Sequence, residues 1–228
     1  MFKRLLAAAS LASLTACNMV VTDKPMFSAA DGAGAPPLRA GVWRIDDPAC
    51  AFDDHLAQSQ WPECAHASPP LGETAPWLLV AGAPPLLQMP LPLPSGTSVS
   101  LYYFYMAYRP LKLDAKGRVV EMATWFVQCG APPPPEPGPV KLEPDAKDLS
   151  ALGKAALTKA PFPGLTLRTD MADCTADSPA ALRNAAKASE ALEHPLRVSR
   201  WVREAGPGDK PAMSADSFKA LMRASPGA

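Results

Sequence analysis

Two cysteines and two histidines in one short segment have the side chains that bind zinc or haem. They are Cys50, His55, Cys64 and His66. Their spacing, C-x4-H-x8-C-x-H, matches no compact metal-binding motif, and an oxidised pair of cysteines accounts for the same residues. The sequence therefore predicts no metal and no cofactor in this segment.

The same segment contains a group that could act as a general base. A carboxylate of Asp53 or Asp54 beside His55 could orient the imidazole, as in a hydrolase that activates water. The hydrolase signatures G-x-S-x-G, S-x-x-K and H-E-x-x-H do not occur in the sequence. A solvated loop explains the three residues more simply. We therefore predict no catalytic residue, and a hydrolase that uses this loop is the alternative hypothesis.

All four tyrosines of the chain lie in one segment, at Tyr102, Tyr103, Tyr105 and Tyr108. In a strand, Tyr103 and Tyr105 share one face, and Tyr102 and Tyr108 share the other. An aromatic surface of this kind could stack on sugar rings or hold an apolar ligand. Packing inside a central strand explains the same residues, and we favour it over a ligand platform.

The first 17 residues combine a positive start at Lys3-Arg4 with an apolar stretch, Leu5 to Leu14, too short for a permanent membrane-spanning helix. Leu14-Thr15-Ala16-Cys17 resembles the bacterial lipobox. The resemblance implies that the thiol of Cys17 receives a diacylglycerol and that the chain is cut before it. The chain thus looks like a proteobacterial envelope lipoprotein. Asn18, rather than an aspartate, follows the cysteine, which in enterobacterial lipoproteins implies the outer membrane, on its periplasmic side.

Four cysteines remain besides Cys17, and an even number in an exported protein predicts two disulfides. We expect Cys50–Cys64, which closes a local loop, and Cys129–Cys174, which bridges a proline-rich connection. The competing pairing joins Cys50 to Cys174 and Cys64 to Cys129. It is suggested by a similarity between Arg44-x-Asp46-x3-Cys50-x2-Asp53 and Arg168-x-Asp170-x3-Cys174-x2-Asp177.

Composition limits the partners. The chain has 22 basic and 22 acidic residues, and without Lys3 and Arg4 the basic count falls to 20. A near-neutral protein without charge runs is not typical of nucleic-acid binding. No later segment is apolar enough to span a membrane, so the lipid on Cys17 is the expected membrane attachment. We expect a structural or binding role, with another envelope protein or a glycan as partner and a periplasmic hydrolase as the alternative.

The elements that would position these residues are mainly strands. Residues 101–108 lie in a strong strand candidate, and Asp114-Ala-Lys-Gly117 is typical of a type I turn leading into a partner strand. Pro90, Pro92 and Pro94 alternate with Met89, Leu91 and Leu93, which predicts an edge strand or an extended arm because the missing amides all face one side. Ser178-Pro179 is a typical helix start. Helical spacing of Leu149, Leu152 and Ala156 predicts a second helix over 148–159, and Ser214 is a candidate cap for a terminal helix.

These signals predict an α+β protein. It would be mainly an antiparallel sheet with a central long hairpin over about 99–128 and two or three helices, mostly in the C-terminal half. The expected divisions are a signal peptide at 1–17, a flexible tether at 18–37, a β-rich half at 38–130, a proline-rich connection at 131–147 and an α+β half at 148–228. The two halves would be either separate or parts of one domain.

Overall fold

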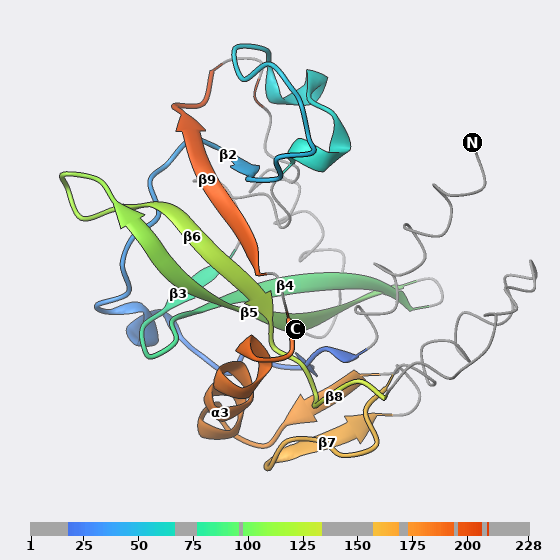
Figure 1. Ribbon diagram of the computed structural model, residues 1–228. Coiled ribbons are helices and arrows are strands. Elements are labelled where there is room, and N and C mark those ends of the chain that lie inside the picture. The colour runs from blue at the N-terminus through green and yellow to red at the C-terminus, as the bar shows by residue number, and fades with distance from the viewer. Residues whose placement is uncertain are drawn as a thin grey trace, which may run out of the picture.

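The computed structural model describes residues 18–66, 77–95, 98–133, 157–168, 173–193, 196–206 and 209 of the 228-residue chain (Figure 1). In chain order the elements are β1 (Val21–Thr22), the 3-10 helix η3 (Ala29–Gly32), β2 (Val42–Ile45), the 3-10 helices η4 (Gln58–Gln60) and η5 (Glu63–Ala65), β3 (Leu78–Val80), β4 (Leu86–Ser95), β5 (Ser98–Leu113), β6 (Val119–Phe126), β7 (Leu165–Arg168), β8 (Asp173–Ala176), α3 (Pro179–Glu190) and β9 (Arg197–Arg203).

The predicted hairpin is confirmed as β5 and β6, and it lies at the centre of a seven-stranded antiparallel sheet. The strand order is β2-β9-β6-β5-β4-β3, with β1 paired to β5 off this path. At the turn, the Gly117 amide donates to the carbonyl of Asp114 at 3.0 Å, and the Asp114 carboxylate accepts from the amides of Lys116 and Arg118. Gly117 has φ 75°, the left-handed conformation that glycine adopts without strain.

The proline-rich strand β4 confirms the edge-strand prediction. It pairs with β5 over its whole length, whereas β3 pairs only with Leu86, Leu87 and Gln88. Beyond Gln88, the part of the chain that the structure describes offers β4 one pairing neighbour. Pro90, Pro92 and Pro94 therefore lack amide donors where none is needed.

Both faces of the central hairpin are covered. On one face Tyr105 and Trp125 pack with Leu182 of α3, and the indole N–H of Trp125 donates to the carbonyl of Ala186 at 2.8 Å. On the other face a second cluster contains Trp43, Leu87, Met89, Met106, Tyr108, Val119 and Met122. Apolar residues on both faces of one strand therefore correspond to two cores.

The expectation of two or three helices is wrong for the described residues, which contain a single α-helix. This helix, α3, starts as predicted: the hydroxyl of Ser178 accepts from the amide of Ala181 at 3.2 Å. The helix expected over 148–159 is absent at its described end, residues 157–159. There the amide of Thr158 donates to the side chain of Asn18, so a tertiary partner replaces the helical carbonyl. The rest of that segment and the helix expected from Ser214 lie outside the described residues. The protein is mainly an antiparallel β structure.

The flexible tether expected at 18–37 is also corrected. Val20 is fully buried, and Val21 and Thr22 pair with Phe104 and Tyr103 of β5. Strand β6 pairs with β5 only as far as Met106, so β1 takes the neighbouring position beyond that point. The backbone of Phe27 is held from both sides by the Gln88 amide, at 2.9 and 3.0 Å. Val20, Val21 and Thr22 therefore belong to the folded body and do not form a flexible tether.

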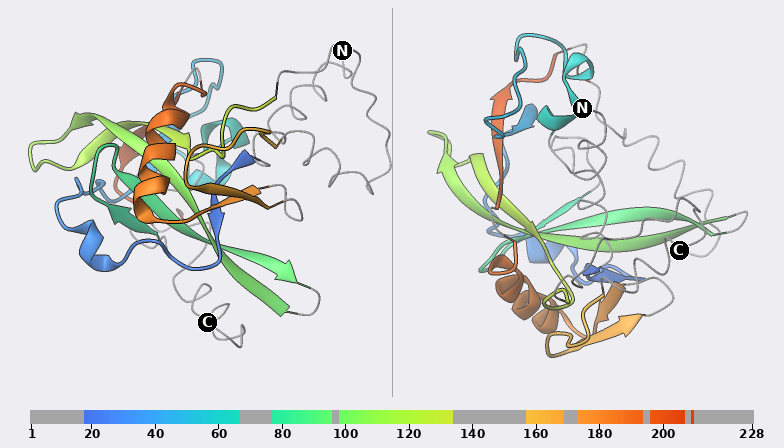
Figure 2. Two further views of the ribbon diagram at one scale, coloured as in Figure 1. Left: turned by 90° about the horizontal axis from the view of Figure 1, so that it is seen from below. Right: turned by 45° about the vertical axis from the view of Figure 1, so that its right-hand side comes forward.

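The two halves of the chain share this sheet. Strand β9, from the half that begins at residue 148, lies between β2 and β6 of the other half. The remaining strands of the C-terminal half, β7 and β8, form a separate two-stranded sheet near the start of the described chain (Figure 2).

Candidate functional site

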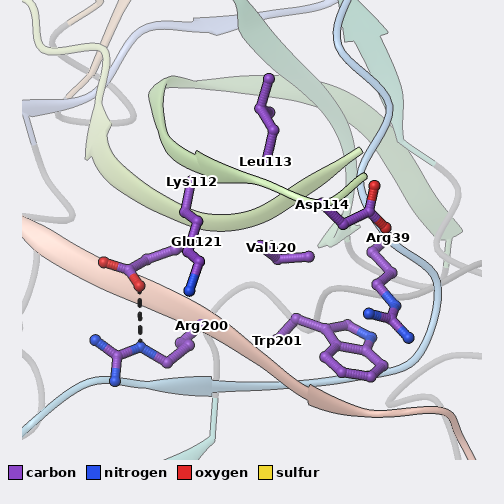
Figure 3. Close-up of a pocket in the computed structure, with 8 residues that line it drawn as sticks. All are labelled: Arg39, Lys112, Leu113, Asp114, Val120, Glu121, Arg200 and Trp201. Atoms are coloured by element: carbon purple, nitrogen blue, oxygen red, sulfur yellow. Dashed lines mark hydrogen bonds and ion pairs between the residues drawn. The ribbon is translucent and has the colours of Figure 1, made fainter. Parts of the chain in front are cut away.

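A hollow of about 470 Å³ lies where the outer end of the hairpin meets β9. Its lining comes from Arg39 before β2, the hairpin end and turn, and two residues of β9; the residues are Arg39, Lys112, Leu113, Asp114, Val120, Glu121, Arg200 and Trp201 (Figure 3). Lys112 and Glu121 extend towards Arg200, whereas Leu113 points away. Three cations and two carboxylates therefore surround one opening.

Arg39 and Trp201 form the wall at one side of the hollow. The guanidinium carbon of Arg39 lies 3.4 Å from the centroid of the Trp201 ring, a close cation–π contact. The indole N–H of Trp201 donates to the carbonyl of Ala40 at 2.8 Å, which fixes the ring. Arg39 also donates to Glu204 at 3.0 Å, and its Nε is buried without a partner in the described part of the chain. One face of the indole is thus already occupied by a side chain of the protein.

Both carboxylates of the hollow form ion pairs with arginines. Arg200 lies 3.1 Å from Glu121 and 2.8 Å from Asp46. The hydrogen bond from Arg118, the largest cause, lowers the pKa of Asp114 to about 2. Lys112 is exposed and has no ion-pair partner among the residues that the structure describes. A paired carboxylate is a poor general base, so this hollow is suited to binding and offers one available cation.

The cysteines of the first candidate group are bonded to each other. Cys50 and Cys64 form a disulfide with 5.8 Å between their Cα atoms, so neither is a thiolate ligand. The imidazole of His66 is hydrogen-bonded within the loop, with Nε2 3.2 Å from the carbonyl oxygen of Trp61. Cys129 and Cys174 form the second disulfide, also at 5.8 Å, and the predicted pairing is therefore the one found.

The possible base, Asp53-Asp54-His55, lies at the surface. The His55 side chain is 93 % exposed, and its Nε2 is 3.8 Å from a carboxylate oxygen of Asp54. Asp53 accepts a hydrogen bond from the backbone of His55 at 3.0 Å, as in a simple polar turn. The ligand atoms of the three residues lie within 4.8 Å of one another, but all three residues are exposed. This geometry provides no wall that would exclude water from the imidazole.

The four tyrosines are divided between the faces of β5, as the alternation predicts. Tyr105 and Tyr108 are 1 % and 0 % exposed, and burial raises the pKa of each to about 12. The hydroxyl of Tyr105 contacts that of Thr22 at 2.6 Å. Tyr102 and Tyr103 are half-buried. The arrangement supports core packing, because two of the four rings are not accessible to a ligand.

Sequence reasoning missed the role of the residues at the start of the described chain. Cys17, the predicted lipidation site, lies outside the described residues, but Asn18 beside it is only 2 % exposed. The side-chain NH2 of Asn18 donates to the carbonyl of Gly130 at 2.7 Å. Its side-chain oxygen accepts from the backbone amide of Thr158 at 3.1 Å. The run Val20-Val21-Thr22 was the available signal for a strand.

The two residues of the buried disulfide also hold this segment. The amide of Cys129 donates to the carbonyl of Asn18 at 2.7 Å, and the amide of Cys174 donates to the carbonyl of Met19 at 3.3 Å. We call Asn18–Thr22, together with Cys129–Gly130, residues 157–162 and β7–β8, the clamped end of the molecule. We call the turn 114–117, the hollow and the loop 46–66 the open end.

The search for similar proteins gave no match. No family model matches the chain, and neither a curated protein nor a solved structure matches it significantly. Among the described residues, no helix has the length and apolar character needed to cross a membrane.

Proposed function

We propose that the protein is a lipid-anchored component of a bacterial envelope with a binding role. The lipobox-like Leu14-Thr15-Ala16-Cys17 at the N-terminus carries this proposal. The two disulfides support it, because such bonds persist in exported proteins and are rare in the bacterial cytosol. Asn18 after the cysteine favours the outer membrane, with the folded part on the periplasmic side.

The lipid would hold the protein by hydrophobic transfer. Each buried methylene contributes about 0.8 kcal/mol, and a single acyl chain is only marginally retentive. Two or three chains on Cys17 would make the attachment effectively permanent. Expression of the full chain in a bacterial host, followed by mass spectrometry of the N-terminal peptide, tests this directly. We expect diacylglyceryl-modified Cys17 at the N-terminus and its absence in Cys17→Ser; an unmodified cysteine in membrane-bound protein contradicts the proposal.

The hollow supports a binding role over catalysis. Its carboxylates are paired with arginines, whereas Lys112 is exposed and available to a carboxylate, phosphate or carbonyl group of an envelope protein or glycan. The test is a pull-down from detergent-solubilised envelopes with wild type, Lys112→Glu and Lys116→Glu. Lys116 is also exposed on this hairpin but does not line the hollow. We expect one partner to be lost only with Lys112→Glu.

The alternative hypothesis, a periplasmic hydrolase, can be tested with the same purified protein. Turnover of a cell-wall or ester substrate that disappears in His55→Ala would favour the loop 53–55 as an active site. The approach of His55 to Asp54 is the one observation on its side. Absence of turnover in the wild-type protein would leave the binding role as the explanation.

A further inference from the structure

The most informative surface outside the hollow is the clamped end, because the lipidation site is covalently attached there. We propose that this end lies directly against the phospholipid headgroups, so that the lipid sets the orientation of the folded body as well as its location. This inference rests on the proposed lipidation of Cys17.

The first step is the fixed position of Asn18. Its side chain is bonded to Gly130 and Thr158, which are 112 and 140 residues away along the chain. Its carbonyl accepts from Cys129, and the next residues pair with Val127, Cys174 and β5. Several separate segments hold this residue, and the buried disulfide joins two of them. Asn18 therefore cannot move away from the body as a linker residue would.

The second step is the reach of the chain. Neighbouring Cα atoms are about 3.8 Å apart, so Cys17 cannot lie farther than that from Asn18. The glycerol attached to its sulfur then begins about 10 Å or less from the Asn18 Cα. A flexible tether of about 20 residues would instead span roughly 25 Å. Without such a tether, the surface around Asn18 has to meet the headgroup layer.

The third step is the character of that surface. Ala131, Lys159 and Ala160 are exposed beside the residues that bind Asn18. Gly130 and Ala160 are also close: a Cβ on Gly130 would lie 2.5 Å from the carbonyl oxygen of Ala160. Small side chains permit close approach to a bilayer, and the Lys159 ammonium is suited to lipid phosphates. This surface therefore fits the headgroups of an anionic bilayer.

The orientation has a consequence for the hollow. The turn that contains Gly117 and the clamped end lie at opposite sides of the molecule (Figures 1 and 2). With the clamped end against the bilayer, the hairpin turn projects away from it. A periplasmic partner of the proposed binding site would then approach from the side opposite the lipid.

The test compares two exposed lysines. Full-length lipidated Lys159→Cys and Lys116→Cys are labelled with an environment-sensitive fluorophore and reconstituted into vesicles of phosphatidylethanolamine and phosphatidylglycerol that contain a nitroxide on the headgroup. We expect the label at position 159 to be quenched several-fold more than the label at position 116. Equal quenching of the two labels in protein that carries the lipid overturns the orientation.

A third variant checks the role of tether length. A flexible Gly/Ser insertion of about 20 residues between Cys17 and Asn18, with an asparagine kept directly after Cys17, should reduce quenching at position 159 to the level at 116. If the insertion leaves the difference intact, attachment at Asn18 is not its cause. Mass spectrometry of the same samples separates the two proposals: protein without lipid on Cys17 contradicts the proposed function, whereas lipidated protein with equal quenching contradicts only the orientation.

Discussion

The clamped end and the open end each contain one disulfide, and the two bonds have different surroundings. Cys129 and Cys174 are both fully buried and join the end of β6 to β8, 45 residues apart. Cys50 is buried but Cys64 is exposed, and their bond closes a loop of 14 residues outside the sheet. The first bond holds together segments that also bind residues 18–20. The second shapes a local loop around Trp61 and Ala65. One disulfide therefore stabilises the packing of several segments at the clamped end, whereas the other stabilises a single loop at the open end.

Removing the buried disulfide should have the largest effect. Cys129→Ala with Cys174→Ala is expected to lower the free energy of unfolding by about 4 kcal/mol, from loop entropy at this separation. The loss should also increase amide exchange at Val20, whose amide donates to the carbonyl of Val127. Chemical denaturation measures the first effect and hydrogen exchange the second. Full protection of the Val20 amide in the double variant would contradict the clamp.

Removing the other disulfide should destabilise the protein less and more locally. For Cys50→Ala with Cys64→Ala the same entropy argument gives about 3 kcal/mol. We expect limited proteolysis to cut within 51–66 while the sheet stays intact, since this loop contacts only the edge of the sheet, at β2 and the end of β9. Cleavage throughout the chain at equal protease concentration would remove the contrast between the two ends.

Asn18 offers a test of the clamp without changing a covalent bond. Asn18→Ala leaves the carbonyl of Gly130 and the amide of Thr158 without their partner in a buried site, at a cost of about 2 kcal/mol. Asn184 is exposed on α3, and Asn184→Ala should be neutral or slightly stabilising because alanine favours helix. Equal unfolding midpoints for the two variants would show that Asn18 does not hold residues 18–22 to the rest of the protein.

The hairpin turn tests the open end in the same way. Gly117→Val forces a β-branched residue into φ 75° and should cost about 1–2 kcal/mol, although a Cβ there would meet no atom within 4 Å. Lys116→Val, one residue earlier, should cost little. A thermal melt of each variant checks the difference, and identical melting temperatures would contradict the left-handed turn.

The smallest expected effects are two pH dependences of opposite sign. Burial raises the pKa of Glu193, after α3, so the stability associated with its protonated form is present below its ordinary pKa and lost as pH rises through the raised value. The pKa of Asp114 at the open end is lowered to about 2, so its contribution is present above the ordinary value and lost as pH falls towards 2. Relative to wild type, Glu193→Gln should therefore gain stability as pH rises, and Asp114→Asn should lose it. Denaturation across pH with both variants would contradict this if the two trends had the same sign.

Local signals predicted much of the fold, and distant contacts account for what was missed. The Asp114–Gly117 turn, the prolines of β4 and the Ser178 cap each act within a few residues, so the sequence displays them directly. The clamp around Asn18 and the contact of Trp201 with Ala40 join residues more than 100 positions apart. A tether and a strand also look alike in a short segment that contains only Val20, Val21 and Thr22 as strand formers. Neither the hollow nor the helix count could be derived from periodicity alone.

The burial of Asn18 also has a consequence in time. Its hydrogen-bond partners are 112 and 140 residues later in the chain, so they are made long after it. At synthesis rates of about 5–20 residues per second, this leaves an interval of roughly 7–28 s before the second partner exists. During that interval Asn18 is not yet held by its partners, so the chain before it is tied to the body only after these later residues are made. If Cys17 is lipidated as proposed, its modification is therefore expected to precede the docking of Asn18.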